Sequence, residues 1–306
     1  CAGGVRTEAT YTVDEEKLPE GFSTFNLVVK GLTGGHSGDD INKKRANANK
    51  LLVRFLLEQS EKTDLRLCDI QAGGLHNAIP REAHATVAVP TAYVATFGEE
   101  LQAFVEKVRD EFSATEPELT AVIEPVAAAP TCICKEQAER LLKSLSVVHN
   151  GIFAMSQDLE GLVETSSNLA SVRKHGNQIV ATTSQRSSVA SNLEYMASVV
   201  RSAFELGGAK CVTNEGYPGW KMNPKSEILK VCVDSYKRLF GKEPLVRAIH
   251  AGLECGLFSE KYPHLDMVSF GPTLRGVHSP DERLLIPTVQ MVWDHLLDVL
   301  KNVPEK

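Results

Sequence analysis

Apolar and polar positions in the first part of the chain change period several times, and each change predicts a new element. Residues 25–41 read as an apolar strand, a glycine-rich loop and a helix start. Residues 65–73 form a second apolar run, and residues 74–90 lead into a strand with the alternation of one buried face. Residues 98–113 place apolar side chains at helical spacing, and residues 118–126 form a fourth strand.

A similar succession then recurs. Residues 135–148 predict a helix, and residues 164–186 predict a hairpin with Gly-Asn at its turn. Residues 187–208 predict a second helix that ends in glycine. We therefore interpret 25–126 and 131–214 as two weakly similar α+β units that share one sheet.

The C-terminal part has a different pattern. A helix is predicted over 226–241, followed by a strand, a loop and a helix over 244–262. Residues 265–272 form an apolar run typical of a strand buried on both faces, and 285–303 predict a closing amphipathic helix. This alternation suggests part of a parallel α/β sheet, with the domain break near the Gly- and Pro-containing residues 214–223.

Composition narrows the class of protein. The 306 residues allow two domains, and 42% hydrophobic with 24% charged residues is ordinary for a globular chain. A net charge of −6 offers no basic face for nucleic acid, and no apolar run approaches a membrane span or a signal peptide. The seven scattered cysteines favour reduced thiols and a cytoplasmic location, with Cys132 and Cys134 structural rather than half of a zinc site.

Two histidines stand in loops that suit chemistry. His278 lies between a strand and the helix-starting residues Ser-Pro-Asp-Glu, where it could bind a metal or merely precede the capping Ser279. His36 lies in GLTGGHSGDD, where the glycines allow close backbone approach. Its imidazole could stabilise an oxyanion, or it could be one more polar residue of a turn.

Four further residues could bind a substrate or fill structural places. Arg186 could hold a carboxylate with two hydrogen bonds, and Asn77 could orient a carbonyl or carboxylate; taken alone, a solvated charge and a turn cap explain them better. Glu254 lies in a glycine-flanked loop and could be a ligand or a substrate contact, whereas His250 is interpreted as packed rather than catalytic.

His264 and Asp266 have a spacing that can bind metal, but we interpret them as the start of an apolar strand.

Four segments together resemble the bacterial aminoacyl-histidine dipeptidases, members of the co-catalytic zinc family that also contains carnosinases, aminoacylases and tripeptidases. The segments are GLTGGHSGDDINKKRANANKLLVRFL, GLHNAIPRE, AIHAGLECGLF and FGPTLRGVHSPDERL. The resemblance covers essentially the whole chain. It implies a lid domain that can dimerise over residues 5–215, and part of an α/β catalytic domain over residues 1–4 and 216–306.

The resemblance also implies roles for single residues. His278 matches a zinc ligand, and His36 matches the lid histidine that stabilises the tetrahedral intermediate. Asn77 and Arg186 match positions that bind the substrate's C-terminal carboxylate, and Glu254 lies in the matching loop near the metals. The intact enzyme is expected to bind two zinc ions, with manganese or cobalt as alternatives, to hydrolyse Xaa-His dipeptides such as β-Ala-His, and to form a homodimer through the lid.

The family's remaining metal ligands and its general base precede the segment that CAGG matches. We therefore expect this chain to be the C-terminal portion of a dipeptidase, inactive by itself and without tightly bound zinc, because a catalytic zinc site needs about three protein ligands. Its lid should fold well, whereas its C-terminal part should need a partner chain or the missing half. The alternatives are a non-catalytic lid and dimerisation module, or another amide hydrolase of the same family, such as a tripeptidase or deacylase.

Overall fold

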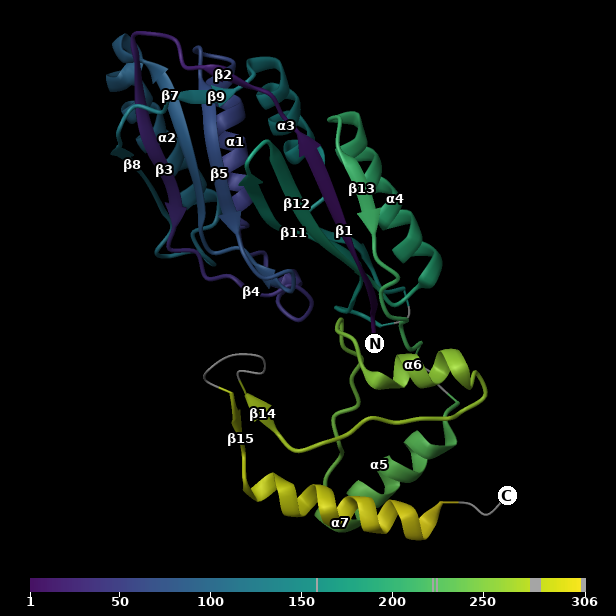
Figure 1. The fold of residues 1–306 in the computed structure, drawn as a ribbon. Helices are drawn as coiled ribbons and strands as arrows, with labels where there is room; N and C mark the ends of the chain where they lie inside the picture. Colours follow the sequence, from purple (N-terminus) through teal and green to yellow (C-terminus); the bar gives the residue numbers. More distant parts are fainter. Residues whose placement is uncertain (158, 222, 224, 276–281, 304–306) are drawn as a thin grey trace. The chain divides into compact units, whose positions relative to one another are not determined.

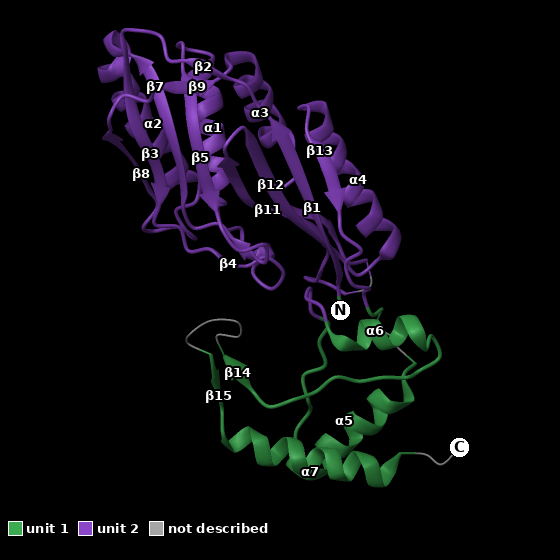
Figure 2. Cartoon of the chain, viewed as in Figure 1, with its two compact units in different colours: residues 1, 220–248, 253–306 green, residues 2–219, 249–252 purple. Residues whose placement is uncertain are grey.

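The computed structural model describes residues 1–306 except 158, 222, 224, 276–281 and 304–306. Its described part divides into two compact units, shown in Figure 2. We call residues 2–219 with 249–252 the sheet unit, and residues 1, 220–248 and 253–306 the helical unit. The fold is mixed α and β with one large sheet, which confirms the predicted class.

The sheet unit contains a nine-stranded sheet in the described chain, in the order β13-β1-β12-β11-β5-β7-β3-β8, with β10 pairing beside β11 (Figure 1). The strands are β1 Gly3–Thr12, β3 Phe22–Lys30, β5 Arg66–Gly73, β7 Ala83–Pro90, β8 Thr120–Pro125, β10 Gly151–Met155, β11 Val163–His175, β12 Gln178–Ser187 and β13 Lys210–Thr213. The helices are α1 Ala48–Ser60, α2 Val94–Glu111, α3 Lys135–Val147 and α4 Ala190–Leu206, with short 3₁₀ turns at Ile41–Lys43 and Thr91–Tyr93. Two small ribbons pair β2 Glu15–Lys17 with β9 Thr131–Ile133, and β4 Gly35–His36 with β6 Ala78–Ile79.

The sheet is built from two copies of one topology. The first copy runs β3-α1-β5-β7-α2-β8 and has the strand order β8-β3-β7-β5. The second runs β1-α3-β11-β12-α4-β13 and has the order β13-β1-β12-β11. In both, the order is fourth, first, third, second, which is the split βαβ arrangement. Two α+β repeats therefore share one sheet, as the sequence pattern predicted.

The predicted limits of the second repeat were incomplete. Its first strand is β1, which lies before the first repeat in the sequence, so the first repeat is an insertion within the second. Local pattern could not show this, because the strands with which β1 pairs, β12 and β13, come more than 160 residues later. The two repeats meet where β5 and β11 pair antiparallel, with Gly73 opposite Ser171.

One face of the sheet carries the helices and the main core. Phe25, Leu27 and Val29 of β3 are buried in this core, and Phe55 of α1 lies 5.4 Å from the ring of Phe97 of α2. Apolar side chains that recur every second residue on a strand, or every third to fourth on a helix, produce this layer.

The same alternation places another set of residues on the opposite face. Ile179 and Ala181 of β12 belong to the helix-side core, so Arg186 faces away from the helices. The register then puts Gly4 of β1 and Ser166 of β11 on either side of Arg186. This end of the helix-free face holds the candidate site.

The helical unit contains α5 Glu227–Phe240, α6 Glu254–Lys261 and α7 Pro287–Asn302, with β14 Leu274–Arg275 paired to β15 Arg283–Leu284. The helices follow the predicted ones. Two predicted strands, the one at the start of 244–262 and the one over 265–272, were wrong for the described structure. Both segments are irregular there, and Leu265 and Phe270 are exposed. An apolar run becomes a strand only where a neighbouring strand accepts its backbone hydrogen bonds. Among the described residues no helix is long and apolar enough to cross a membrane.

Candidate functional site

His36 and Asn77 are brought together by the β4–β6 ribbon. His36 pairs with Ala78, and the Ser37 N–H donates to the Asn77 carbonyl at 2.8 Å. The chain can turn here because Gly34 and Gly35 have φ of +63° and +134°, a region that favours glycine. The two loops that sequence analysis singled out are therefore one local structure.

The imidazole of His36 has a defined tautomer in its neutral form. Its Nδ1 accepts from the N–H groups of Gly38 at 3.2 Å and Asp39 at 3.1 Å. A nitrogen that accepts carries no proton, so in neutral His36 the proton is on Nε2. Neutral His36 is thus a hydrogen-bond donor through Nε2, as the stabilisation of an oxyanion requires.

Asp40 holds this loop. Its Oδ2 accepts from the backbone N–H of His36 at 2.8 Å, and Arg45 Nη1 lies 3.3 Å away. Burial opposes ionisation of Asp40, but the hydrogen bonds from Lys43 and His36 and the charge of Arg45 lower its pKa overall. The ionised carboxylate fixes the loop without using the imidazole.

Arg186 is a buried cation without an acidic partner among the described residues. Its side chain lies on β12 with 6% of its surface exposed. Nη1 donates to Tyr217 Oη at 2.7 Å, while the buried Nε has no acceptor among the described residues. A buried guanidinium with an unused N–H edge is suited to bind a carboxylate through two parallel hydrogen bonds.

A short segment, Ile249–Gly252, belongs to the sheet unit, and its His250 is near enough to Arg186 and His36 to be affected by their charges. His250 is 5% exposed, and its Nε2 forms a 2.8 Å hydrogen bond with Ser166 Oγ. Its carbonyl lies so close to Gly38 that a side-chain carbon there would be 2.3 Å away. Burial, and then the positive charge of Arg186, lower the pKa of His250 to about 4, with a further contribution from His36. His250 is packed, as interpreted from the sequence, and it also connects the two candidate residues.

The other predicted site residues lie elsewhere or are only partly placed. Asn77 is half-buried beside His36, whereas Glu254 begins α6 of the helical unit. Asp266 accepts from the backbone N–H of Ile228 at 3.0 Å, so it caps α5 rather than starting a strand. His278 lies outside the described residues.

The described residues contain no group of three or more His, Cys, Asp or Glu side chains that could hold a metal ion. All seven cysteines are free thiols. The side chains of the described residues do not by themselves form the donor set of a metal centre.

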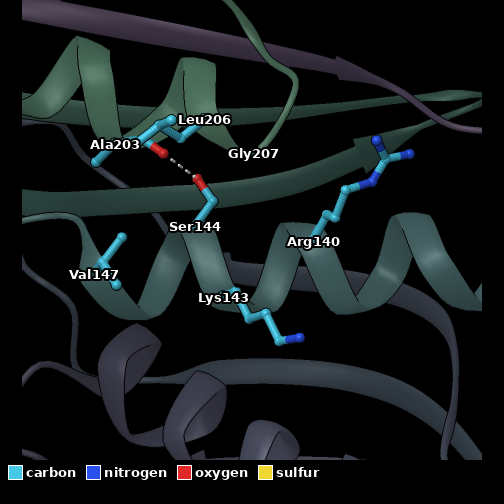
Figure 3. A pocket seen from close by; sticks show the side chains of 7 residues that line it. All are labelled: Arg140, Lys143, Ser144, Val147, Ala203, Leu206 and Gly207. Carbon is cyan, nitrogen blue, oxygen red and sulfur yellow. Dashed lines mark hydrogen bonds between the residues drawn. The ribbon is translucent and has the colours of Figure 1, made fainter.

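A separate pocket of about 190 Å³ lies between α3 and α4 (Figure 3). It is lined mainly by apolar surface, and its polar Ser144 Oγ already donates to the Ala203 carbonyl at 2.8 Å. None of the predicted site residues lines this pocket, which is a groove between packed helices.

Comparison with known proteins agrees with this arrangement. Residues 20–119 match the family described as peptidase dimerisation domain, and this range covers the first repeat from β3 to α2, without β8. The whole chain is 40% identical to the cytosol non-specific dipeptidase of Escherichia coli and covers 63% of its length. It is also 40% identical to the structure of aminoacylhistidine dipeptidase from Vibrio alginolyticus, with a TM-score of 0.91 over 100% of this chain and 62% of that one.

This chain is a relative of those dipeptidases. The resemblance inferred from four short segments is therefore confirmed along the whole sequence. The chain spans less than two thirds of the length of either dipeptidase.

Sequence reasoning missed one residue of the cluster and undervalued another. Tyr217 lies within the predicted break between domains, and His250 was predicted to be packed rather than catalytic. In the sequence, the glycines at positions 4 and 252 could have indicated this contact. Both leave space for the ring of Tyr217, which a larger residue at either position would displace.

Proposed function

We propose that this chain provides the substrate-binding lid of a metal-dependent dipeptidase that hydrolyses Xaa-His dipeptides such as β-Ala-His. Arg186 and Asn77 bind the free C-terminal carboxylate of the substrate. His36 donates a hydrogen bond to the oxygen that becomes negative when water adds to the peptide carbonyl. We also propose Glu254, the first residue of α6, as a substrate contact.

The observation that carries this proposal is the buried guanidinium of Arg186, which has no acidic partner among the described residues. A buried charge without a partner destabilises a fold, so its place is understandable if a ligand supplies the anion. A free carboxylate is present in every dipeptide, and a site that requires it excludes the interior of longer chains. The neutral tautomer of His36, in the same neighbourhood, supplies the donor that amide hydrolysis needs.

The resemblance to the dipeptidases supports a metal requirement. We propose two zinc ions in the intact enzyme, with His278 as one ligand, and no tight zinc binding by the residues of this chain alone. The metal would supply activated water when bound. The work of the chain's own residues is to hold the carboxylate and to donate at the developing oxyanion.

The same resemblance supports the remaining proposals on partners and location. The peptidase dimerisation match over 20–119 supports a homodimer formed through the sheet unit. The cytosolic relative supports a cytoplasmic location. We propose the lid domain over 5–215, with 1–4 and 216–306 as part of the catalytic domain.

The test compares β-alanyl-histidine with its C-terminal amide. The intact enzyme should hydrolyse the free acid. Arg186→Lys should lower its kcat/KM for the acid by roughly 30-fold or more, because Lys cannot make two parallel hydrogen bonds to a carboxylate. The amide should be a poor substrate for both forms. Arg201→Lys, an exposed position on α4, is the matched control and should behave as the parent.

Equal rates for the acid and the amide in the parent enzyme would refute carboxylate recognition. If the 306-residue chain shows no hydrolysis, the same comparison is made by calorimetric binding of the two peptides. Equal binding of acid and amide would then refute the proposal as well.

A further inference from the structure

The phenol ring of Tyr217 lies in a slot made by two glycines from distant parts of the chain. A side-chain carbon at Gly4 would lie 2.6 Å from Tyr217 Oη, and one at Gly252 would lie 2.5 Å from its Cε2. Both distances are far below van der Waals contact, so any residue other than glycine would displace the ring. The slot belongs wholly to the sheet unit.

The backbone of Tyr217 is fixed to the same strand. Tyr217 N–H donates to the Gly4 carbonyl at 2.9 Å, and Gly4 N–H donates to the Tyr217 carbonyl at 3.0 Å. Gly216 precedes it with φ of +72°, and a side-chain carbon there would lie 2.2 Å from the Gly4 carbonyl oxygen. Tyr217 is therefore held at both its backbone and its ring.

Gly4 is also the direct cross-strand neighbour of Arg186. Because Gly4 has no side chain, the ring of Tyr217 can lie over β1 and its hydroxyl can accept from Arg186 Nη1 at 2.7 Å. On the other side of Arg186, Ser166 is occupied by its hydrogen bond with His250. One terminal nitrogen of the guanidinium is thus fixed, while Nε has no acceptor within the part of the chain that the structure describes.

We propose that Tyr217 is a positioning residue that holds the Arg186 guanidinium in the orientation needed to bind a substrate carboxylate through its Nε edge. This inference rests on the proposed function, because it assumes that Arg186 is the carboxylate anchor. A guanidinium held in place loses less rotational freedom when the carboxylate binds, and this raises affinity without a new contact to the substrate.

The first measurement concerns orientation and needs no ligand. In the parent chain, the hydrogen bond to Tyr217 should slow rotation of the Arg186 guanidinium, so that its Nη protons give separate NMR signals. Tyr217→Phe removes only the hydroxyl and should merge these signals. Tyr195→Phe makes the same change at an exposed position on α4 and should leave them separate. Arg186→Lys identifies the signals by their loss.

The second measurement is calorimetric binding of β-alanyl-histidine and of its C-terminal amide to the full chain. Tyr217→Phe should weaken binding of the acid by about tenfold, because the released guanidinium must then be ordered when the carboxylate binds, and it should leave binding of the amide unchanged. Gly4→Ala should have the same effect, since it displaces the ring while the hydroxyl remains. Circular dichroism of each variant checks that it is folded.

The two hypotheses fail separately. If Arg186→Lys abolishes the preference for the acid but Tyr217→Phe keeps both the preference and the separate signals, the positioning role is wrong and the carboxylate site stands. If Arg186→Lys keeps the preference, the carboxylate site itself is wrong.

Discussion

Two basic side chains, Arg186 and His250, are buried near one another, and only one of them can keep its charge. A guanidinium stays protonated in proteins, so His250 is the group that is neutral. Burial and the neighbouring charge hold the pKa of His250 near 4. The hydrogen bond of His250 with Ser166 is therefore made by a neutral imidazole at neutral pH.

This neutral histidine makes stability depend on pH in a predictable direction. The pKa is about 6.5 in the unfolded chain and about 4 in the folded one, so between these values the unfolded state binds the extra proton. Stability is full above pH 6.5 and falls as the pH drops towards 4. Between pH 7 and pH 5, protonation of His250 in the unfolded chain should lower the free energy of unfolding by about 2 kcal/mol.

His250→Gln keeps a polar side chain at this position and should abolish this pH-dependent fall in the free energy of unfolding. Urea unfolding followed by circular dichroism measures the free energy of unfolding at pH 7 and at pH 5. His175→Gln, an exposed change at the β11–β12 turn, is the control and should retain the parent's full pH dependence. An equal pH dependence in His250→Gln and the parent would contradict the neutral assignment.

At the scale of elements, the junction of the two repeats depends on one close approach. Gly73 at the end of β5 has φ of +71°, and a side-chain carbon there would lie 2.1 Å from the Ala170 carbonyl oxygen. The backbone of β11 occupies the space that any other residue would need. The pairing that joins β5 to β11 therefore requires glycine for two reasons, conformation and space.

Gly73→Ala should destabilise the sheet unit by roughly 3 kcal/mol or more, since strain and collision add. Gly176→Ala is a matched control, because Gly176 also has positive φ, +57°, but has open space around it. It should cost only about 1 to 2 kcal/mol. Urea unfolding followed by far-ultraviolet circular dichroism compares the stability of the two variants. Equal losses of stability would show that the close approach of Gly73 to the Ala170 carbonyl is unimportant.

At the scale of the whole molecule, the two units differ in how much apolar surface they bury. Nearly all the buried apolar side chains belong to the sheet unit. Among the described residues of the helical unit, only Cys232 and Val299 are buried apolar side chains, while Trp293, Leu297 and Leu300 on α7 are exposed. Burial of apolar surface is the main stabilising contribution, so the helical unit has little independent stability.

We therefore predict two unfolding transitions. Both tryptophans, Trp220 and Trp293, lie in the helical unit, so tryptophan fluorescence reports on that unit alone. The midpoint of urea unfolding measured by tryptophan fluorescence should come at a lower urea concentration than the main midpoint measured by circular dichroism, because circular dichroism follows the whole chain. Coincident midpoints would show that the units unfold together.

The sequence by itself determined the helices, most strands and the repeated pattern, because periodicity and glycine positions act over a few residues. It also determined His36, Asn77 and Arg186 as candidates, and the relationship to the dipeptidases. Only the tertiary structure decided that β1 completes the second repeat, and that Tyr217 and His250 flank Arg186. These contacts join residues between 31 and 213 positions apart, and their register depends on sheet pairing that no local pattern specifies. The strands predicted at the start of 244–262 and over 265–272 were wrong for the same reason, since a strand needs a partner that its own sequence does not reveal.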